Sequence, residues 1–213
     1  MISPDIKAVV FDLDGTLYDR RGLPRRLVLG SLANLYILGA ERAVRKEIAG
    51  VYYGSEEAFY EAFFDKIAAK SKVSREHIRR WYFTRYIPRM VRLLAKHHHI
   101  YGWVPQVMQE LRNKGIKIAI FSDYGCVEEK LQAVGFNTEW ADYIFDVPSL
   151  GGIKPCRECF EKVARKLGLE PSQIMVVGDR DDTDGEGARR SGMPFLKVDV
   201  ESDGANVPAG LIG

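Results

Sequence analysis

Two aspartates separated by a single residue end the first apolar run of the chain. Residues 9–11 (VVF) precede Asp12, and Gly15 follows Asp14 at the start of a turn. Side chains two positions apart leave a strand on the same side, so we expect the carboxylates of Asp12 and Asp14 to converge. Converging carboxylates repel each other unless a shared proton, a basic neighbour or a metal cation offsets their charge. The stretch therefore indicates a site that holds two acids together for chemistry.

Polar side chains also follow two later apolar runs. Ser122 and Asp123 end the second run, and Asp179 ends the third, directly before the acidic loop RDDTD at 180–184. Carboxylates without a converging histidine suit a hard cation, and Mg²⁺ in particular takes one or two carboxylates together with substrate phosphate oxygens. Lys154, in the loop GGIKP, is the basic residue whose position predicts neutralisation of both the carboxylates and an anionic substrate.

The elements that must position these residues alternate between strands and helices. Strands are predicted at 9–11, 116–123, 143–147, 174–179 and 194–198, and helices at 104–115, 126–136, 156–169 and 184–192. Such alternation predicts an α/β fold whose parallel sheet is covered by helices on both faces. Ligands of these sheets bind beyond the carboxyl ends of the strands, which is where the polar residues lie.

The stretch from residue 20 to 99 has helix-like spacing and almost no strand pattern. Ser74 is a candidate N-cap, and Gly39, Gly50 and Gly54 are candidate breaks between helices. The longest uncharged run in it, residues 27–40, has 14 residues, whereas a membrane-spanning helix needs roughly 20. We expect a packed helix there.

The composition is typical of an ordinary globular protein. The chain has 213 residues, of which 46% are hydrophobic, and its net charge of +2 is too close to neutral to indicate a nucleic-acid partner. Its three cysteines, Cys126, Cys156 and Cys159, offer no disulfide framework. The first ten residues lack the pattern of a signal peptide. These features predict a cytoplasmic protein with no membrane partner.

In order and spacing, the polar residues resemble four motifs of the haloacid dehalogenase-like superfamily, specifically its Mg²⁺-dependent phosphatase branch. The residues 12–16 read DLDGT and match the first motif, DxDGT. Ser122 matches the second motif, Lys154 followed by proline matches the third, and Asp179 with Asp184 matches the acidic pair of the fourth. The resemblance covers residues 6–19 and 103–198. It implies a Rossmann-like three-layer core with a parallel sheet, made of residues 1–19 and 100–213, and an inserted α-helical cap domain over residues 20–99.

The resemblance also implies a mechanism and the residues that perform it. Asp12 would be the nucleophile that forms an aspartyl-phosphate, and Asp14 would protonate the leaving oxygen and then activate water. The implied Mg²⁺ ligands are Asp12, Asp14 through its backbone carbonyl, Asp179 and Asp184. The implied substrate-binding residues are Ser122, Asp123 and Lys154. The expected substrate is a small phosphorylated metabolite.

Several alternatives stay open at this point. Asp181 and Asp182 lie between the fourth-motif acids and could replace or join Asp184 at the metal. A phosphomutase would share the core, as would a phosphonatase that uses a Schiff-base lysine from Lys46, Lys66, Lys70 or Lys72. A non-catalytic phosphate-binding or interaction module could retain the same fold. Substrate identity and oligomeric state are not indicated by the sequence.

Two further patterns have ordinary explanations. Cys156 and Cys159 form a lone CxxC without a second ligand pair, and we interpret them as residues that start a helix. The segment 74–99 is rich in arginine and aromatic residues, which favours a solvated helix face with the aromatic rings turned inward over an anion-binding patch. Its three consecutive histidines, residues 97–99, are predicted to be exposed. We expect no salt-dependent RNA binding.

Overall fold

A five-stranded parallel sheet forms the centre of the molecule. The computed structural model describes residues 2–199 and 206–211, and within these ranges the strand order is β3-β2-β1-β4-β5. The strands are β1 (Ala8–Phe11), β2 (Lys117–Ser122), β3 (Tyr143–Asp146), β4 (Ile174–Gly178) and β5 (Phe195–Lys197). All five predicted strands are confirmed, within two or three residues at each end.

Strand β1 lies in the middle and fixes the register of its two neighbours. Phe11 pairs with Ile120 of β2 on one side and with Val177 of β4 on the other. The amide of Asp12 then donates to the carbonyl of Val177 at 2.8 Å, so the pairing continues one residue beyond the strand. The carboxyl ends of these three strands therefore meet at one edge, as the sequence predicts.

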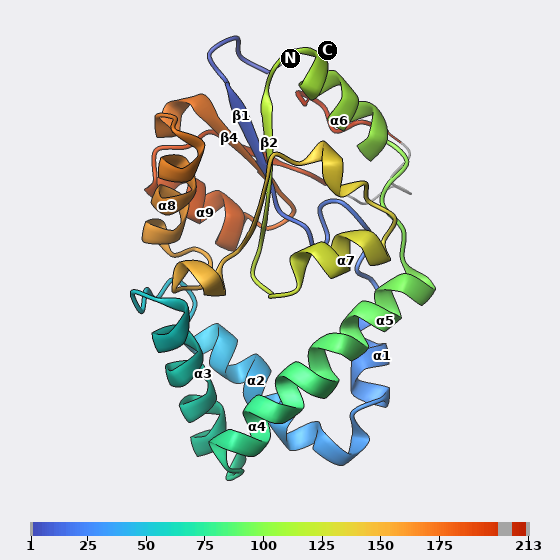
Figure 1. Cartoon of the computed structure of the whole chain (residues 1–213), viewed down its shortest axis with the longest axis vertical. Helices are drawn as coiled ribbons and strands as arrows, with labels where there is room; N and C mark the ends of the chain where they lie inside the picture. The colour runs from blue at the N-terminus through green and yellow to red at the C-terminus, as the bar shows by residue number, and fades with distance from the viewer. Residues whose placement is uncertain (1, 200–205, 212–213) are drawn as a thin grey trace.

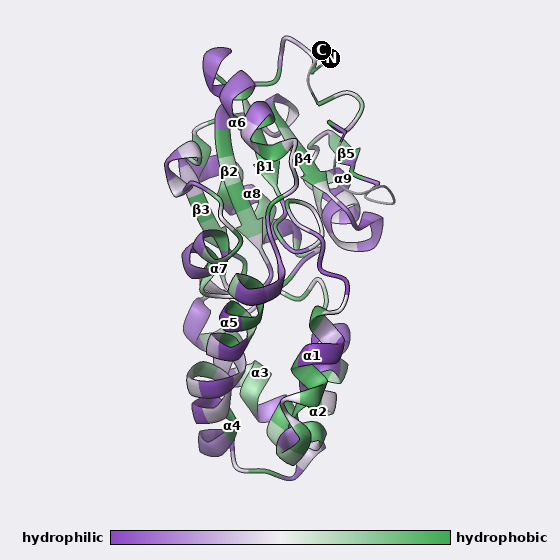
Figure 2. Ribbon diagram, turned by 90° about the vertical axis from the view of Figure 1, so that its right-hand side faces the viewer, coloured by the Kyte–Doolittle hydropathy of each residue, from purple (hydrophilic) through white to green (hydrophobic). Residues whose placement is uncertain are grey.

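Helices cover both faces of the sheet, which makes three layers (Figure 1). One face carries α6 (Val104–Asn113) and α7 (Val127–Ala133), and the other carries α8 (Arg157–Leu167) and α9 (Glu186–Arg190). Because strand side chains alternate, Val9 and Phe11 pack into one buried cluster and Ala8 and Val10 into the other. Figure 2 shows the strands among the most hydrophobic parts of the ribbon. The three-layer α/β architecture is confirmed.

Five further helices lie beyond the carboxyl edge of the sheet (Figure 1) and form what we call the helical segment, residues 23–97. They are α1 (Leu23–Leu29), α2 (Leu35–Glu47), α3 (Glu56–Ser71), α4 (Arg75–Trp81) and α5 (Ile87–His97). A short 3₁₀ turn, Leu32–Asn34, leads into α2, and a π-helical stretch, Tyr82–Tyr86, continues α4 directly into α5. Ser74 caps α4 as predicted, because its hydroxyl accepts a hydrogen bond from the amide of His77 at 3.3 Å.

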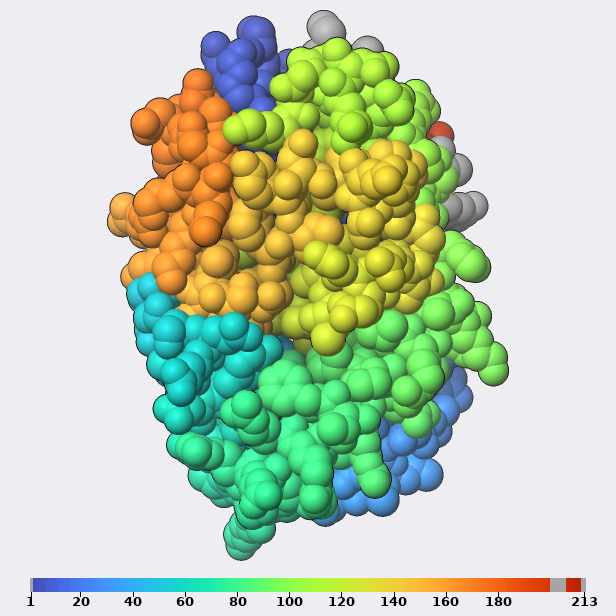
Figure 3. All heavy atoms as spheres, viewed as in Figure 1, coloured from blue at the N-terminus to red at the C-terminus, as the bar shows by residue number. Residues whose placement is uncertain are grey.

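Aromatic side chains form the interior of the helical segment. Phe59 and Phe63 stack with ring centroids 5.6 Å apart, and Phe64 lies edge-on to Tyr82 at 5.5 Å. All four rings are buried. In the space-filling view, the surface of the helical segment is continuous with that of the sheet layers (Figure 3). The prediction that the aromatic rings of segment 74–99 turn inward is confirmed for Trp81, Tyr82 and Tyr86, which are buried, and is wrong for Phe83, which is exposed.

The chain leaves and re-enters the sheet layers at adjacent points. Tyr18 and Ile100 form an isolated antiparallel bridge, and the amide of Tyr101 donates to the carbonyl of Leu17 at 2.9 Å. His98 lies at this junction with its Nδ1 atom 2.6 Å from the carbonyl oxygen of Asp19. The prediction that residues 97–99 are exposed is therefore wrong for His98, which is only 6% exposed because the returning chain packs against residues 17–19.

The apolar run at 27–40 also differs from its prediction. It does not form one packed helix, because α1 ends at Gly30 and the chain turns before α2 begins. Four apolar side chains around this turn are exposed, namely Leu29, Leu32, Leu35 and Tyr36. Within the described residues no single helix has the length and hydropathy to cross a membrane. Helix α1 and residues 32–47 are long and apolar enough only when taken together, and the two are bent by 87° relative to each other.

Two glycines inside helices predict opposite effects of the same substitution. A methyl group added to Gly39 of α2 meets no atom within 4 Å, so Gly39→Ala should raise the free energy of unfolding by about 0.5–1 kcal/mol through helix propensity. A methyl group on Gly187 of α9 would lie 2.2 Å from the ring of Phe160, so Gly187→Ala should lower it by roughly 1–3 kcal/mol. Urea denaturation measures both changes, and the same sign for the two variants would contradict this packing.

Candidate active site

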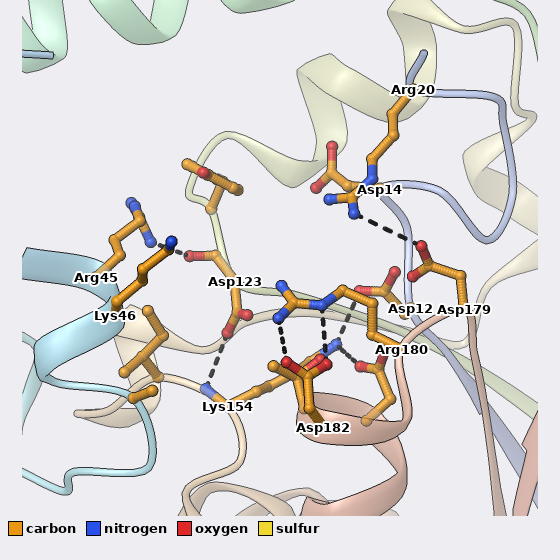
Figure 4. A pocket seen from close by; sticks show the side chains of 15 residues that line it. Asp12, Asp14, Arg20, Arg45, Lys46, Asp123, Lys154, Asp179, Arg180 and Asp182 are labelled. Atoms are coloured by element: carbon orange, nitrogen blue, oxygen red, sulfur yellow. Dashed lines mark hydrogen bonds and ion pairs between the residues drawn. The ribbon is translucent and has the colours of Figure 1, made fainter. Parts of the chain in front are cut away.

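A cavity of about 360 Å³ opens at the carboxyl edge of the sheet, between the strand ends and α2 of the helical segment. Figure 4 shows its side chains. The predicted site residues Asp12, Asp14, Asp123, Lys154, Asp179 and Asp184 all line it. Ser122 does not line it and is fully buried. The cavity wall also includes Lys46 and Asp182, which the sequence offered as alternatives. Its other residues, to which the sequence assigned no role, are Arg20, Arg45, Ala49, Tyr124, Ile153, Arg180 and Thr183.

Both oxygens of the Asp12 carboxylate are held by hydrogen bonds. The ammonium of Lys154 donates to Oδ1 at 2.8 Å, and the hydroxyl of Thr16 donates to Oδ2 at 3.0 Å. Asp12 is only 9% exposed. A carboxylate fixed at two points in this way keeps one orientation toward the cavity.

Lys154 is buried with three hydrogen-bond acceptors around its ammonium. Besides Asp12, these are Oδ1 of Asp184 at 2.7 Å and the carbonyl oxygen of Phe121 at 2.7 Å. Burial alone would lower the pKa of Lys154, but the charges of Asp12 and Asp184 outweigh burial and hold this pKa above its ordinary value. Its backbone amide donates to Oδ1 of Asp123 at 3.0 Å, which fixes the loop to the end of β2.

The Gly-Thr pair of the first motif joins the ends of β1 and β4. The amide of Asp179 donates to the hydroxyl oxygen of Thr16 at 3.0 Å, so Thr16 bridges Asp179 and Asp12. Gly15 has φ of 105°, and a Cβ atom there would lie 2.6 Å from Oδ2 of Asp179. Only glycine satisfies both conditions, which gives the motif a physical reason.

Three carboxylates could hold a metal ion. One oxygen from each of Asp12, Asp179 and Asp184 lies within 4.8 Å of the others. Burial and the charge of Asp12 raise the pKa of Asp179 to about 6. Burial raises the pKa of Asp184 to about 7, although Lys154 opposes the shift. Oδ1 of Asp179 is buried and has no hydrogen-bond partner among the described residues, so a cation would supply what this oxygen lacks.

The carboxylate of Asp14 has a separate environment with its own lysine. The ammonium of Lys130, from α7, donates to Oδ2 of Asp14, and the hydroxyl of Ser122 donates to the same oxygen at 3.0 Å. The hydroxyl of Tyr18 donates to Oδ1. Burial alone would raise the pKa of Asp14, but Lys130 and these hydrogen bonds outweigh burial and hold it below its ordinary value. The two acids of the first motif are thus neutralised by different partners.

Ser122 faces Asp14 instead of the cavity. The side chain of Ser122 is turned toward Asp14 and Lys130, so in this arrangement it positions Asp14, and its role as a substrate ligand stays a prediction.

Two acids of the fourth-motif loop pair with arginines: Asp181 pairs with Arg189 at 2.8 Å, and Asp182 pairs with Arg180 at 2.6 Å. Of the four acids in and before the loop, the structure brings Asp179 and Asp184 to Asp12.

Sequence reasoning missed several residues that shape the site. Lys130 reads as an ordinary charged residue of a helix (VEEKLQA), and only the fold brings it to Asp14, 116 positions earlier. Arg45 of α2 donates to the carbonyl of Asp123 at 3.2 Å, and its guanidinium lies 4.0 Å from the ring centroid of Tyr124. Thr16, which bridges Asp12 and Asp179, was also given no role, although its position inside the DxDGT motif was a signal that could have identified it.

Cys156 and Cys159 begin α8, as interpreted from the sequence. Cys156 is the N-cap residue and Cys159 lies in the first turn. Both are buried, and their sulfur atoms lie 3.2 Å apart without a disulfide bond. Neither lines the cavity.

Comparisons with known proteins agree with this geometry. A family model described as haloacid dehalogenase-like hydrolase matches residues 6–192. The chain is 27% identical to a glyceraldehyde 3-phosphate phosphatase from Methanopyrus kandleri, over 91% of this chain and 84% of that protein. It is 25% identical to a phosphoglycolate phosphatase from Aquifex aeolicus, over 88% of this chain and 82% of that protein.

Among solved structures, the fold is similar to that of a β-phosphoglucomutase from Clostridium difficile. The TM-score is 0.67 at 19% identity, and the match covers 93% of this chain and 86% of that chain. At this identity the likeness concerns the fold. The family match, by contrast, extends over both the sheet layers and the helical segment and includes every acid of the cluster. The chain therefore belongs to the haloacid dehalogenase-like hydrolases.

Proposed function

We propose that the chain is a Mg²⁺-dependent phosphomonoester hydrolase that acts on a small phosphorylated metabolite. The observation that carries this proposal is the fixed carboxylate of Asp12, held by Lys154 and Thr16 beside two further acids at the wall of a cavity. The phosphatase names of the two relatives support the same reaction class. The small size of the cavity, about 360 Å³, supports a small organic phosphate.

Asp12 is the nucleophile in this proposal. Its carboxylate oxygen attacks phosphorus, the bond from phosphorus to the substrate oxygen breaks, and an aspartyl-phosphate forms. Water then attacks the same phosphorus, the bond to Asp12 breaks, and inorganic phosphate leaves. Lys154 holds Asp12 in place before the attack, and its positive charge lies beside the oxygens that become negative.

Asp14 transfers the protons of both steps. It gives a proton to the leaving oxygen in the first step and takes one from water in the second. The low pKa that Lys130 maintains suits the second role, because a base must be ionised. An incoming phosphate dianion raises the proton affinity of Asp14 by charge repulsion, which suits the first role.

Asp12, Asp179 and Asp184 would hold the Mg²⁺ ion, together with the backbone carbonyl of Asp14. When bound, the ion neutralises charge on the transferring phosphoryl group. The donor set fits, because it is all oxygen and one of its oxygens lacks a partner. Asp123 completes the site by fixing the loop that carries Lys154.

We further propose that residues 20–99 are a cap domain over a core made of residues 1–19 and 100–213. The cavity supports this division, since Arg45 and Lys46 of α2 form its wall opposite the strand ends. Substrate selection would then come from these side chains. A cytoplasmic location is also proposed, and the three cysteines without disulfide bonds support it.

The geometry bears on one rival reaction of the same family, that of a phosphonatase. A phosphonatase needs a lysine in the cavity, and of Lys46, Lys66, Lys70 and Lys72 only Lys46 lines it. Lys66 and Lys70 instead pair with Glu47 at 2.7 and 3.0 Å. A phosphomutase would return the phosphoryl group to a sugar, and a non-catalytic module would release none. Product analysis with inorganic phosphate detection separates these cases.

Replacing the nucleophile is the direct test. Asp12→Asn should lower Mg²⁺-dependent hydrolysis of p-nitrophenyl phosphate by more than about 10³-fold, because an amide cannot form the intermediate. Asp181→Asn is a matched control, since Asp181 is exposed and paired with Arg189, and should keep activity within about twofold. Undiminished release by Asp12→Asn, or no release by the wild type on a panel of metabolite phosphates, would favour a non-catalytic module.

The free energy of unfolding of the metal-free protein should depend on pH through Asp179. The pKa of Asp179 is raised from 3.8 to about 6, so the folded state loses stability as pH rises through that interval. Asp179→Asn should therefore stabilise the protein in EDTA by on the order of 1–3 kcal/mol at pH 8, and by less at pH 5.

Mg²⁺ should reverse the stability order of the wild type and Asp179→Asn. Added Mg²⁺ should raise the melting temperature of the wild type, because it binds the folded state, and raise that of Asp179→Asn much less. Thermal denaturation with and without Mg²⁺ measures both effects. Equal Mg²⁺ shifts in the two proteins would place the ion elsewhere.

The lysine beside Asp14 should set the pH dependence of the reaction. Lys130→Gln removes the charge that lowers the pKa of Asp14 while keeping a donor, so burial then raises this pKa. The acidic limb of the pH profile for hydrolysis of the aspartyl-phosphate, the step in which Asp14 takes a proton from water, should move to higher pH by roughly one unit. Lys166→Gln, an exposed change on α8, serves as control. An unchanged acidic limb in a folded Lys130→Gln protein would remove Asp14 from the titrating step.

A further inference from the structure

A second cavity lies inside the helical segment, away from the active site. It has a volume of about 240 Å³ between the end of α1 and the start of α5. Its lining includes Gly30, Ser31, Trp81, Arg85, Arg89 and Arg92. It shares no lining residue with the active-site cavity, and no acidic residue lines it. A neighbouring hollow shares Trp81 and Arg85 with it and adds His77 and Arg80.

The three arginines of this cavity lack the acidic partners that some other basic residues of the helical segment have. Arg85, Arg89 and Arg92 form no ion pair with any residue in the ranges 2–199 and 206–211. By contrast, Arg75 pairs with Asp65, and Arg45 pairs with Glu41. Three like charges gathered around a concave surface repel each other, and an anion would remove that repulsion.

The Nε atom of Arg89 is the donor in this cavity that most needs an acceptor. It is buried and has no hydrogen-bond partner among the described residues. Leaving a buried charged donor unsatisfied is costly, so such atoms usually face a ligand or an ordered water. The lining of the cavity also includes Ser31 and Asn34, whose hydroxyl and amide groups are suitable neighbours for an oxyanion.

Local structure explains how the guanidinium reaches this position. Arg85, Arg89 and Arg92 follow the spacing i, i+4, i+7, which places them on one side of the helical turns from Tyr82 to His97. The guanidinium of Arg89 lies against Gly30, where a Cβ atom would be only 1.3 Å from one of its nitrogens. Glycine at the end of α1 therefore leaves the space that Arg89 occupies.

We propose that this cavity binds the phosphate group of a small ligand, at a site separate from the active site. Guanidinium groups match the geometry of phosphate oxygens and donate two hydrogen bonds at once. The volume accommodates a phosphate group together with a small attached group. The proposal does not depend on the catalytic activity, because none of its residues contacts the acid cluster. A bound phosphate would link α1 to α5 through the same anion.

Trp81 provides a local reporter. Its indole lines the cavity, and the chain has only two other tryptophans, Trp103 and Trp140. In ¹H–¹⁵N spectra, the indole signal absent from Trp81→Phe identifies Trp81. Titration with inorganic phosphate and with pyrophosphate, in EDTA, should shift this signal saturably. A larger affinity for pyrophosphate would indicate a polyphosphate ligand, and equal affinities would indicate a single phosphate group.

Two variants test the arginine geometry, each with a matched control. Gly30→Ala keeps every charge but fills the position of the Arg89 guanidinium, and it should weaken binding at least tenfold, whereas Gly39→Ala should bind as the wild type does. Arg92→Gln should also weaken binding at least tenfold, whereas Arg165→Gln, an exposed change on α8, should not.

Three results would overturn the proposal. The first is a Trp81 signal that does not move in up to 20 mM of either anion. The second is an equal affinity in the wild type and in Arg92→Gln. The third is a shift produced by a short RNA oligomer but by neither anion, which would make the arginines a nucleic-acid surface instead.

Discussion

The buried ammonium of Lys154 is the interaction on which the site depends. It lies between Asp12 and Asp184 and also binds the carbonyl oxygen of Phe121. Without a cation in this position, the acids from the ends of β1 and β4 would face one another across a low-dielectric interior, and their repulsion would separate the strand ends or protonate the carboxylates. The parallel register of the sheet brings the acids together, and the lysine allows them to stay there.

The two acids of the first motif show how one short sequence yields two chemical environments. Asp12 lies in the acid cluster with Lys154 and Thr16, whereas Asp14 is turned to Lys130, Ser122 and Tyr18. The turn at Gly15 separates the two side chains that a continued strand would have placed on one side. Two neighbouring carboxylates can therefore differ in charge partners and in proton affinity, which is the condition for giving one the role of nucleophile and the other that of acid and base.

Much of the core was predictable because it depends on local pattern. Apolar runs that end in aspartate or serine identify β1, β2 and β4, and their parallel arrangement brings Asp12 and Asp179 together. Contacts between distant parts of the chain were not predictable in this way. Lys130 in a polar helix, Arg45 in the helical segment and the buried His98 all owe their surroundings to packing across the fold. The break after Gly30 was missed because an uncharged run does not reveal that a glycine ends a helix within it.

Tyr18 takes part in two structures at once. Its backbone forms the bridge to Ile100, where the chain enters and leaves the helical segment, and its hydroxyl donates to Asp14. A change in backbone position at this crossing would move the phenol as well, so the attachment of the helical segment and the pKa of Asp14 are linked through a single residue.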